Sequence, residues 1–280
     1  MLAADSNLMP LAGGTDIIPK MHKQPHIEQL KSGDPAPPST REEVVLLNLS
    51  NIEELFGLTA ENHQIKIGAL TTHTEIAINQ LIKTYFPILA EAAAVIGSVQ
   101  IRNRGTIGGN IVNASPAADL VAPLVAIGAK LVLTSPNGKR QIDVEQFAIS
   151  PGKTIKQSDE LLSVVSLALP SGRNIQFFKR LAPRKAQGIS KVSLAFFANL
   201  EDDILSGVRI ALGAVGPTVI SAQKTACLLE QKVVDVALIQ QAMELIKSEA
   251  MPISDVRSTA EYRRAMVGEL LRQGLEEALI

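Results

Sequence analysis

The sequence predicts an α+β protein in which runs of strands and runs of helices occupy different parts of the chain. In the second half, extended apolar segments follow one another at 161–170, 174–182, 191–200 and 204–215. Helical periodicity then dominates from about 221 to 250 and from about 259 to the end. Strands followed by helices are typical of a separate α+β domain, and we place its start at residue 171.

The first half predicts strands and helices joined by loops. Apolar segments at 44–50 and 63–72 are predicted strands, and the proline-rich stretch 28–43 before them is a predicted exposed loop. The helical pattern at 74–97 contains Pro87, which removes a backbone hydrogen-bond donor and therefore separates two helices.

A short helix and a hairpin are predicted next. Asp119 is a candidate N-cap of a helix that ends near Gly128. Residues 130–147 predict a hairpin, because Asn137-Gly138 lies between two extended runs and favours a tight turn.

Composition excludes several classes of function. A net charge of −1 over 280 residues offers no basic surface for a polyanion, and an aromatic fraction of 3% argues against stacking on single-stranded nucleic acid. The single cysteine, Cys227, excludes an iron–sulfur cluster held by this chain alone, and its helical surroundings predict a small core residue. The sequence shows neither a signal peptide nor an apolar run long enough for membrane insertion, so we expect a cytoplasmic location.

Two clusters of paired glycines stand out, AGGTD at 12–16 and TIGGN at 106–110. Glycine allows positive φ and close approach of a ligand, and successive amides in such a turn form an anion-binding nest. Two facing nests would hold a pyrophosphate without Lys or Arg. Each cluster could instead be an ordinary tight turn. Neither matches the GxGxxG dinucleotide fingerprint or the P-loop.

Several other polar residues could have either a functional or a structural role. The Asp119 carboxylate could accept hydrogen bonds from ribose hydroxyls, which is compatible with a capping role. His22 and His26 are spaced for half a metal site on a helix, but no third ligand is near, so we predict no metal site. Ser258 or Thr259 is the predicted cap of the last helix. The arginines in this segment form a solvated face or, less favoured, a subunit contact; they are Arg257, Arg263 and Arg264.

Four motifs, in order along nearly the whole chain, resemble the FAD-binding subunit of the molybdenum hydroxylases: LAGGTDIIPKM, IGSVQIRNRGTIGGNIVNASPAADLVAPLVAIGAKL, KRLAPRKAQGISKV and SDVRSTAEYRRAMV. This family includes the medium subunit of aerobic carbon monoxide dehydrogenase and the flavin domain of xanthine dehydrogenase. The resemblance implies a two-part FAD-binding region of the PCMH/vanillyl-alcohol-oxidase type at 1–57 and 58–170. A C-terminal α+β domain with an antiparallel sheet and helices would follow at 171–280. Members usually have a strand and a helix before the AGG loop, so we expect the first subdomain to be truncated at its start.

The resemblance also implies which residues contact FAD. Around the pyrophosphate it places Ala12, Gly13, Gly14, Thr15 and Asp16, together with Thr106, Ile107, Gly108, Gly109 and Asn110. Asp119 would lie near the ribose and adenine, Ile96 and Leu162 would make apolar contacts to the flavin or adenine, and Lys179 would lie by the isoalloxazine. Asn113 and Ser115 are further candidates on the second loop. Lys179 could equally be a solvated strand residue, and no residue is a predicted catalytic acid or base.

The implied function is electron transfer. In the family, a molybdopterin-binding large subunit hydroxylates the substrate, and electrons pass through iron–sulfur clusters of a small subunit to FAD and then to NAD, a quinone or oxygen. We therefore expect a hetero-oligomer, a dimer of heterotrimers. One alternative is a flavin-free structural subunit. Another is a stand-alone flavin oxidoreductase, which would need an aromatic-lined pocket containing a base.

Overall fold

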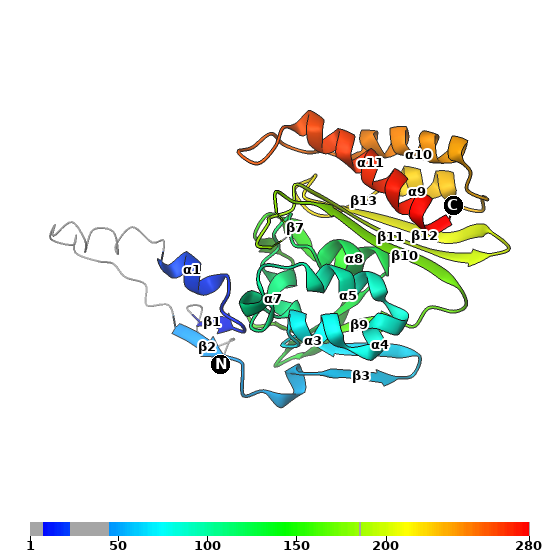
Figure 1. Cartoon of the computed structure of the whole chain (residues 1–280). Coiled ribbons are helices and arrows are strands. Elements are labelled where there is room, and N and C mark those ends of the chain that lie inside the picture. Colours follow the sequence, from blue (N-terminus) through cyan, green and yellow to red (C-terminus); the bar gives the residue numbers. More distant parts are fainter. Residues whose placement is uncertain (1–7, 23–44, 185, 280) are drawn as a thin grey trace.

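The computed structural model describes residues 8–22, 45–184 and 186–279, which form an α+β fold with mainly antiparallel sheets. The predicted loop at 28–43 and His26 lie outside the described residues. At one end of the molecule, β1 (Leu8–Leu11) pairs in parallel with β2 (Val45–Asn48), and the short helix α1 (Ile17–His22) lies beside them (Figure 1).

The middle of the chain forms a five-stranded antiparallel sheet. Its strands, in spatial order, are β3 (Leu58–Glu61), β4 (Gln64–Gly68), β9 (Leu161–Ala168), β5 (Lys130–Ser135) and β6 (Gly138–Asp143). Between β4 and β5 the chain forms α3 (His73–Ile78), α4 (Gln80–Tyr85), α5 (Pro87–Ala94), α6 (Val99–Arg102), α7 (Ile107–Val112) and α8 (Val121–Ala126). Smaller elements are the 3-10 turns η1 (Glu53–Leu55) and η2 (Val144–Gln146), and the strand pair β7 (Ala148–Ser150) and β8 (Lys153–Thr154).

Local sequence accounts for these boundaries. Pro87 begins α5, as predicted, but the chain also breaks at Asn79, whose side chain accepts hydrogen bonds from the amides of Leu81 and Ile82 and so caps α4. The helix predicted near 119–128 is α8, which ends at Ala126, and Gly128, with φ +69°, turns the chain two residues later. The predicted hairpin is confirmed in the pairing of β5 with β6.

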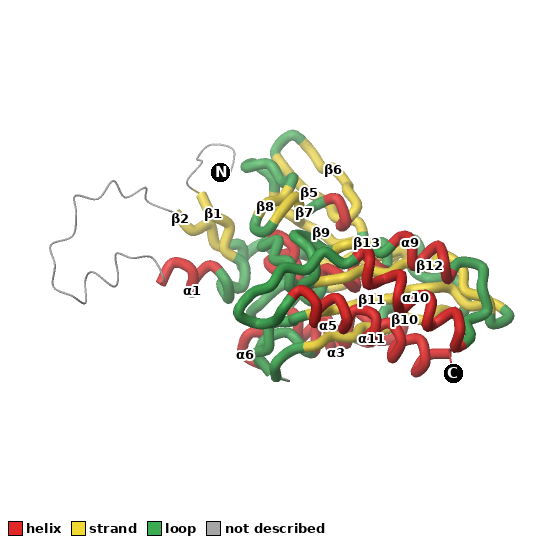
Figure 2. The backbone as a smooth tube through the Cα atoms, turned by 90° about the horizontal axis from the view of Figure 1, so that it is seen from above, coloured by secondary structure: helices red, strands yellow, loops and turns green. Residues whose placement is uncertain are grey.

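The C-terminal part forms a four-stranded antiparallel sheet covered on one face by helices (Figures 1 and 2). Its strands are β10 (Asn174–Leu181), β11 (Val192–Glu201), β12 (Ile204–Gly213) and β13 (Ile220–Ser221). The covering helices are α9 (Gln223–Leu229), α10 (Val236–Glu249) and α11 (Ala260–Leu279). The segment predicted as one helix from 221 to 250 is therefore two. Thr259 caps α11, because its hydroxyl accepts from the amide of Tyr262.

Two large apolar clusters lie on opposite faces of the C-terminal sheet. One face packs on α5 and α8 and shares its core with the five-stranded sheet, while the other packs on α9 to α11. Successive residues of a strand point to opposite faces, so Phe177 faces the outer helices and Phe178 faces the shared core. The C-terminal sheet is thus joined to the middle of the chain through a continuous core.

Two expectations about single side chains are wrong. Cys227 is exposed, since α9 directs the neighbouring Thr225 and Leu229 inward instead. Arg263 does not belong to a solvated face: only 4% of it is exposed, and it is held by hydrogen bonds in the interior. None of the helices within the described ranges is long and apolar enough to cross a membrane.

Candidate flavin site

The first glycine cluster packs against the turn that leads into the second. A Cβ atom built on Gly13 would lie 1.8 Å from the carbonyl oxygen of Arg104, just before the second cluster. Gly14 adopts φ +73°, which side chains rarely tolerate, and it allows the chain to turn from β1 into α1. Glycine is therefore required at both positions, one for close backbone contact and one for conformation.

The backbone amides of the two clusters differ in availability. In the second cluster, Ile107 donates to the carbonyl of Thr71, Gly108 to that of Ala69, and Gly109 to the Thr106 hydroxyl. In the first cluster, the amides of residues 13, 14 and 15 make no hydrogen bond within the described ranges. Of the two, only the first cluster keeps free amides for the predicted nest, because those of the second are used inside the fold.

The paired glycines of the second cluster also have different surroundings. A Cβ on Gly108 would lie 2.7 Å from the carbonyl oxygen of Ala69, so this glycine lets α7 pack on the residue after β4. A Cβ on Gly109 would meet only the Thr106 hydroxyl, at 3.1 Å, and would otherwise enter open space. The adjacent Asn110 has a buried side-chain oxygen without a hydrogen-bond partner in the structure as described. The open position and the buried, unpartnered oxygen thus belong to neighbouring residues.

Lys20, which is not among the predicted contact residues, connects the two glycine-containing segments. The Lys20 ammonium on α1 donates to the side-chain oxygen of Asn113, at 2.8 Å, and forms an ion pair with Asp16, at 2.5 Å. Two predicted site residues from distant parts of the sequence are thereby connected. The i,i+4 spacing of Asp16 and Lys20 predicts their ion pair. The sequence near Lys20 does not predict its contact with Asn113, which lies 93 residues later.

Asp119 lies in the interior, with 7% of its surface exposed, and does not cap α8. Its two carboxylate oxygens accept from the Ser190 hydroxyl, at 2.5 Å, and from the Arg180 guanidinium, at 2.6 Å. Burial raises the pKa of Asp119, and these two partners oppose that shift. The predicted cap is wrong because the side chain turns toward β10 and the strand-connecting segment before β11. Its contact with ribose stays a prediction.

Comparison with known proteins identifies the family. Residues 38–171 match the family described as "FAD binding domain in molybdopterin dehydrogenase". Residues 177–278 match the family described as "CO dehydrogenase flavoprotein C-terminal domain". The chain belongs to the FAD-binding subunits of the molybdopterin dehydrogenases.

Full-length relatives agree with this assignment. The chain is 28% identical to a xanthine dehydrogenase FAD-binding subunit of Escherichia coli O157:H7, over 100% of this chain and 91% of that protein. It is 29% identical to a carbon monoxide dehydrogenase medium chain of Hydrogenophaga pseudoflava, over 99% and 90%. A solved structure of carbon monoxide dehydrogenase from the same organism superposes with a TM-score of 0.87, at 27% identity, over 99% of this chain and 91% of that chain. The chain is thus a flavin-binding oxidoreductase subunit.

The structure offers an FAD-binding subunit a suitable cradle for its cofactor. Free amides of the first cluster, the open position at Gly109 and the unpartnered oxygen of Asn110 provide donors, space and an acceptor. An FAD pyrophosphate needs donors at close range, and this backbone supplies them without a cation in the turn. The residues present therefore fit the cofactor.

Three predicted contact residues lie farther from the clusters. Ile96 is half-buried in the turn after α5, and its carbonyl accepts from Arg102 at 2.9 Å. Leu162 is buried in β9, within the shared core. Lys179 forms an ion pair with Glu277 of α11, and strand alternation directs it to the face of β10 opposite Arg180. The contacts of these residues with FAD stay predictions.

His73, which no sequence motif indicates, supports the turn before the second cluster. The imidazole is buried beside Gly105, where a Cβ would lie 3.0 Å from His73 Cδ2, and the His73 amide donates to the Gly105 carbonyl. Burial, and secondarily the charge of Arg102, lowers the pKa of His73 to about 4. A neutral imidazole therefore packs under the turn at neutral pH.

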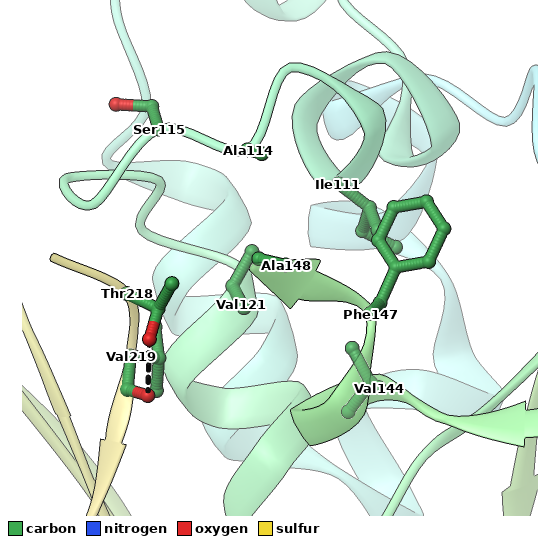
Figure 3. A pocket seen from close by; sticks show the side chains of 9 residues that line it. All are labelled: Ile111, Ala114, Ser115, Val121, Val144, Phe147, Ala148, Thr218 and Val219. Atoms are coloured by element: carbon green, nitrogen blue, oxygen red, sulfur yellow. Dashed lines mark hydrogen bonds between the residues drawn. The ribbon is translucent and has the colours of Figure 1, made fainter. Parts of the chain in front are cut away.

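A small apolar cavity lies behind Ser115 (Figure 3). Its volume of about 20 Å³ has room for little more than one water. The lining residues are Ile111, Ala114, Ser115, Val121, Val144, Phe147, Ala148, Thr218 and Val219. One aromatic ring and no ionisable group line it, so this cavity does not provide the substrate pocket that a stand-alone flavin oxidoreductase would need.

Proposed function

We propose that this chain is the electron-transfer subunit of a molybdopterin-dependent hydroxylase or dehydrogenase. It would take electrons from iron–sulfur clusters of a partner subunit and pass them through FAD to NAD, a quinone or oxygen. When bound, FAD supplies a carrier that accepts and releases electrons singly or in pairs. The observation that carries the proposal is the close approach of Gly13 to the Arg104 carbonyl, which brings the first cluster, with its free amides, against the turn that leads into the second cluster.

Each part of the chain has a defined task in this proposal. The amides of residues 13, 14 and 15 donate to the pyrophosphate, and the Asn110 oxygen accepts from the cofactor. Lys20 keeps α1 against the end of α7 and so closes the cradle. Asp119, Ile96, Leu162 and Lys179 contact the nucleotide and flavin portions, as do Asn113 and Ser115. No side chain acts as a catalytic acid or base.

The proposal requires partner subunits. A single cysteine cannot ligate an iron–sulfur cluster, so the donor centres belong to another chain. Relatives named as a medium chain and as an FAD-binding subunit support a complex with a molybdopterin-binding large subunit and an iron–sulfur small subunit. We propose a cytoplasmic dimer of heterotrimers, in which this chain has FAD-binding subdomains at 1–57 and 58–170 and a third domain at 171–280.

The test uses the complex purified through a tag on this chain. We expect iron, molybdenum and FAD in fixed ratio to the chain. After anaerobic reduction, rapid mixing with NAD, with a quinone and with oxygen should show reoxidation of the flavin absorbance by at least one acceptor. The same complex carrying Gly109→Val should keep its iron and molybdenum but lose FAD and acceptor reduction.

Two outcomes would contradict the proposal. A chain that purifies without iron or molybdenum, yet oxidises a substrate by itself, would support a stand-alone oxidoreductase. A flavin-free Gly109→Val complex that still reduces the acceptor at the wild-type rate would make this chain a structural subunit.

A further inference from the structure

The guanidinium of Arg263 joins two elements in the interior. One of its nitrogens donates to the carbonyl of Ala214, at 2.9 Å, and another pairs with Asp255, at 2.5 Å. Its remaining nitrogen, Nε, is buried without a partner within the described residues. Apolar side chains of similar volume often stabilise a protein interior as well as a buried ion pair does. The particular contribution of Arg263 is therefore the position that it imposes on Ala214.

Ala214 is held in an unfavourable conformation. It follows β12 with φ +61°, in the left-handed region that glycine occupies readily and alanine does not. Only 7% of its surface is exposed, so no solvent contact compensates. A hydrogen bond from the charged Arg263 to the Ala214 carbonyl is a strong interaction that can fix this peptide.

The amide of Ala214 extends the connection to the candidate flavin site. It donates to the carbonyl of Pro116, at 2.8 Å, in the segment between α7 and α8. This segment contains Ser115 and leads directly to Asp119, both of which are expected to contact FAD. The amide of Ala214 is thus a support for that segment from the C-terminal sheet.

We infer that Arg263 is a positioning residue for FAD binding, which acts through the Ala214 peptide to hold the segment 114–119 in place. The inference rests on the proposed flavin site. It assigns a functional reason to an arginine that lies on α11, the last helix of the chain, and that contacts none of the predicted FAD-binding residues directly.

The experiment compares FAD affinity in variants of the full chain, with thermal unfolding measured in parallel. Arg263→Met keeps most of the buried volume but removes the bond to the Ala214 carbonyl. Arg257→Ala is the matched control, because Arg257 is exposed and pairs with the same Asp255 carboxylate. Ala214→Gly is introduced alone and together with Arg263→Met, since glycine adopts the left-handed conformation without external support.

We expect Arg263→Met to raise the Kd for FAD about tenfold or more, and Arg257→Ala to change it less than about twofold. Ala214→Gly should restore much of the affinity in the Arg263→Met background while changing little alone. This non-additivity is specific to a positioning role, because a general loss of stability would leave the two substitutions independent. If Arg263→Met does not fold, Arg263→Lys should weaken FAD binding at an unchanged melting temperature.

The possible negative results distinguish the role of Arg263 from the location of the flavin site. Equal Kd values for wild type and Arg263→Met, or for wild type and Arg263→Lys, would refute the role of Arg263, provided that Gly109→Ala weakens binding. Independent effects of Arg263→Met and Ala214→Gly would refute it as well. A wild-type Kd that Gly109→Ala leaves unchanged would instead refute the proposed location of the flavin site.

Discussion

Replacing Gly109 by alanine should affect folding and cofactor binding in opposite directions. Gly109 lies within α7, and the added methyl group would meet only the Thr106 hydroxyl, at 3.1 Å, which must give by a few tenths of an ångström. Alanine in a helix interior is favoured over glycine by about 1 kcal/mol. We therefore expect the unfolding free energy of the cofactor-free protein to stay constant or rise by up to about 1 kcal/mol.

The same methyl group should weaken FAD binding, because it enters the space that the proposal assigns to the cofactor. Overpacking by one carbon in a close-fitting site typically costs about 1–3 kcal/mol. A loss of this size in binding free energy raises the Kd for FAD about 5- to 150-fold. The assay is titration of the cofactor-free protein with FAD, followed by quenching of flavin fluorescence, together with urea unfolding without FAD.

Gly108→Ala is the matched comparison. Its methyl group would lie 2.7 Å from the backbone oxygen of Ala69, so it should lower the unfolding free energy of the cofactor-free protein. A Gly109→Ala protein that binds FAD as tightly as wild type would refute the reasoning. So would a loss of stability as large as that caused by Gly108→Ala.

Three further outcomes are expected. Gly13→Ala should separate the two clusters, because its methyl would lie 1.8 Å from the Arg104 carbonyl oxygen; FAD affinity should fall about tenfold or more by the same titration, and unchanged affinity would contradict the contact. The pKa of His73 is about 4 in the folded protein and 6.5 in the unfolded chain. This difference adds about 3 kcal/mol to the unfolding free energy above pH 6.5, and the addition is lost as the pH falls toward 4. Urea unfolding across this pH range should show a fall in unfolding free energy that is absent in His73→Asn. Identical pH profiles of wild type and variant would refute this role of His73. Cys227 should react stoichiometrically with a thiol reagent in the folded protein, whereas protection until unfolding would indicate a core position.

The sequence was most informative where the structure depends on local chemistry. Most strands of the two larger sheets, the break at Pro87 and the cap at Thr259 follow from periodicity and capping preferences over a few residues, whereas the short strands β3 and β13 were not predicted. The helix break at Asn79 used the same chemistry and could have been found. Asp119 was misjudged because the capping pattern is local, whereas its partners, Arg180 and Ser190, lie 61 and 71 residues later in the chain.

The two glycine clusters look equivalent in sequence, but their neighbours make them different. In the second cluster, Ala69 and Thr71, which follow β4, accept the amides of Gly108 and Ile107, so Gly108 serves packing, whereas Gly109 leaves an open position. The first cluster has no such neighbour among the described residues and keeps its amides available. Two copies of a similar motif can therefore differ in how many backbone amides they leave free, according to which backbone lies beside each.

The segment 114–119 shows how much of the candidate site depends on distant parts of the chain. Ala214 supports Pro116, while Arg180 and Ser190 hold Asp119, and all three come from the C-terminal sheet or its connections. The same sheet shares its apolar core with the five-stranded sheet. The middle of the chain supplies the glycines of the second cluster, but its geometry near Asp119 is set by strands that follow it. The FAD-binding region and the C-terminal domain should therefore act as one unit in cofactor binding, although sequence families divide them.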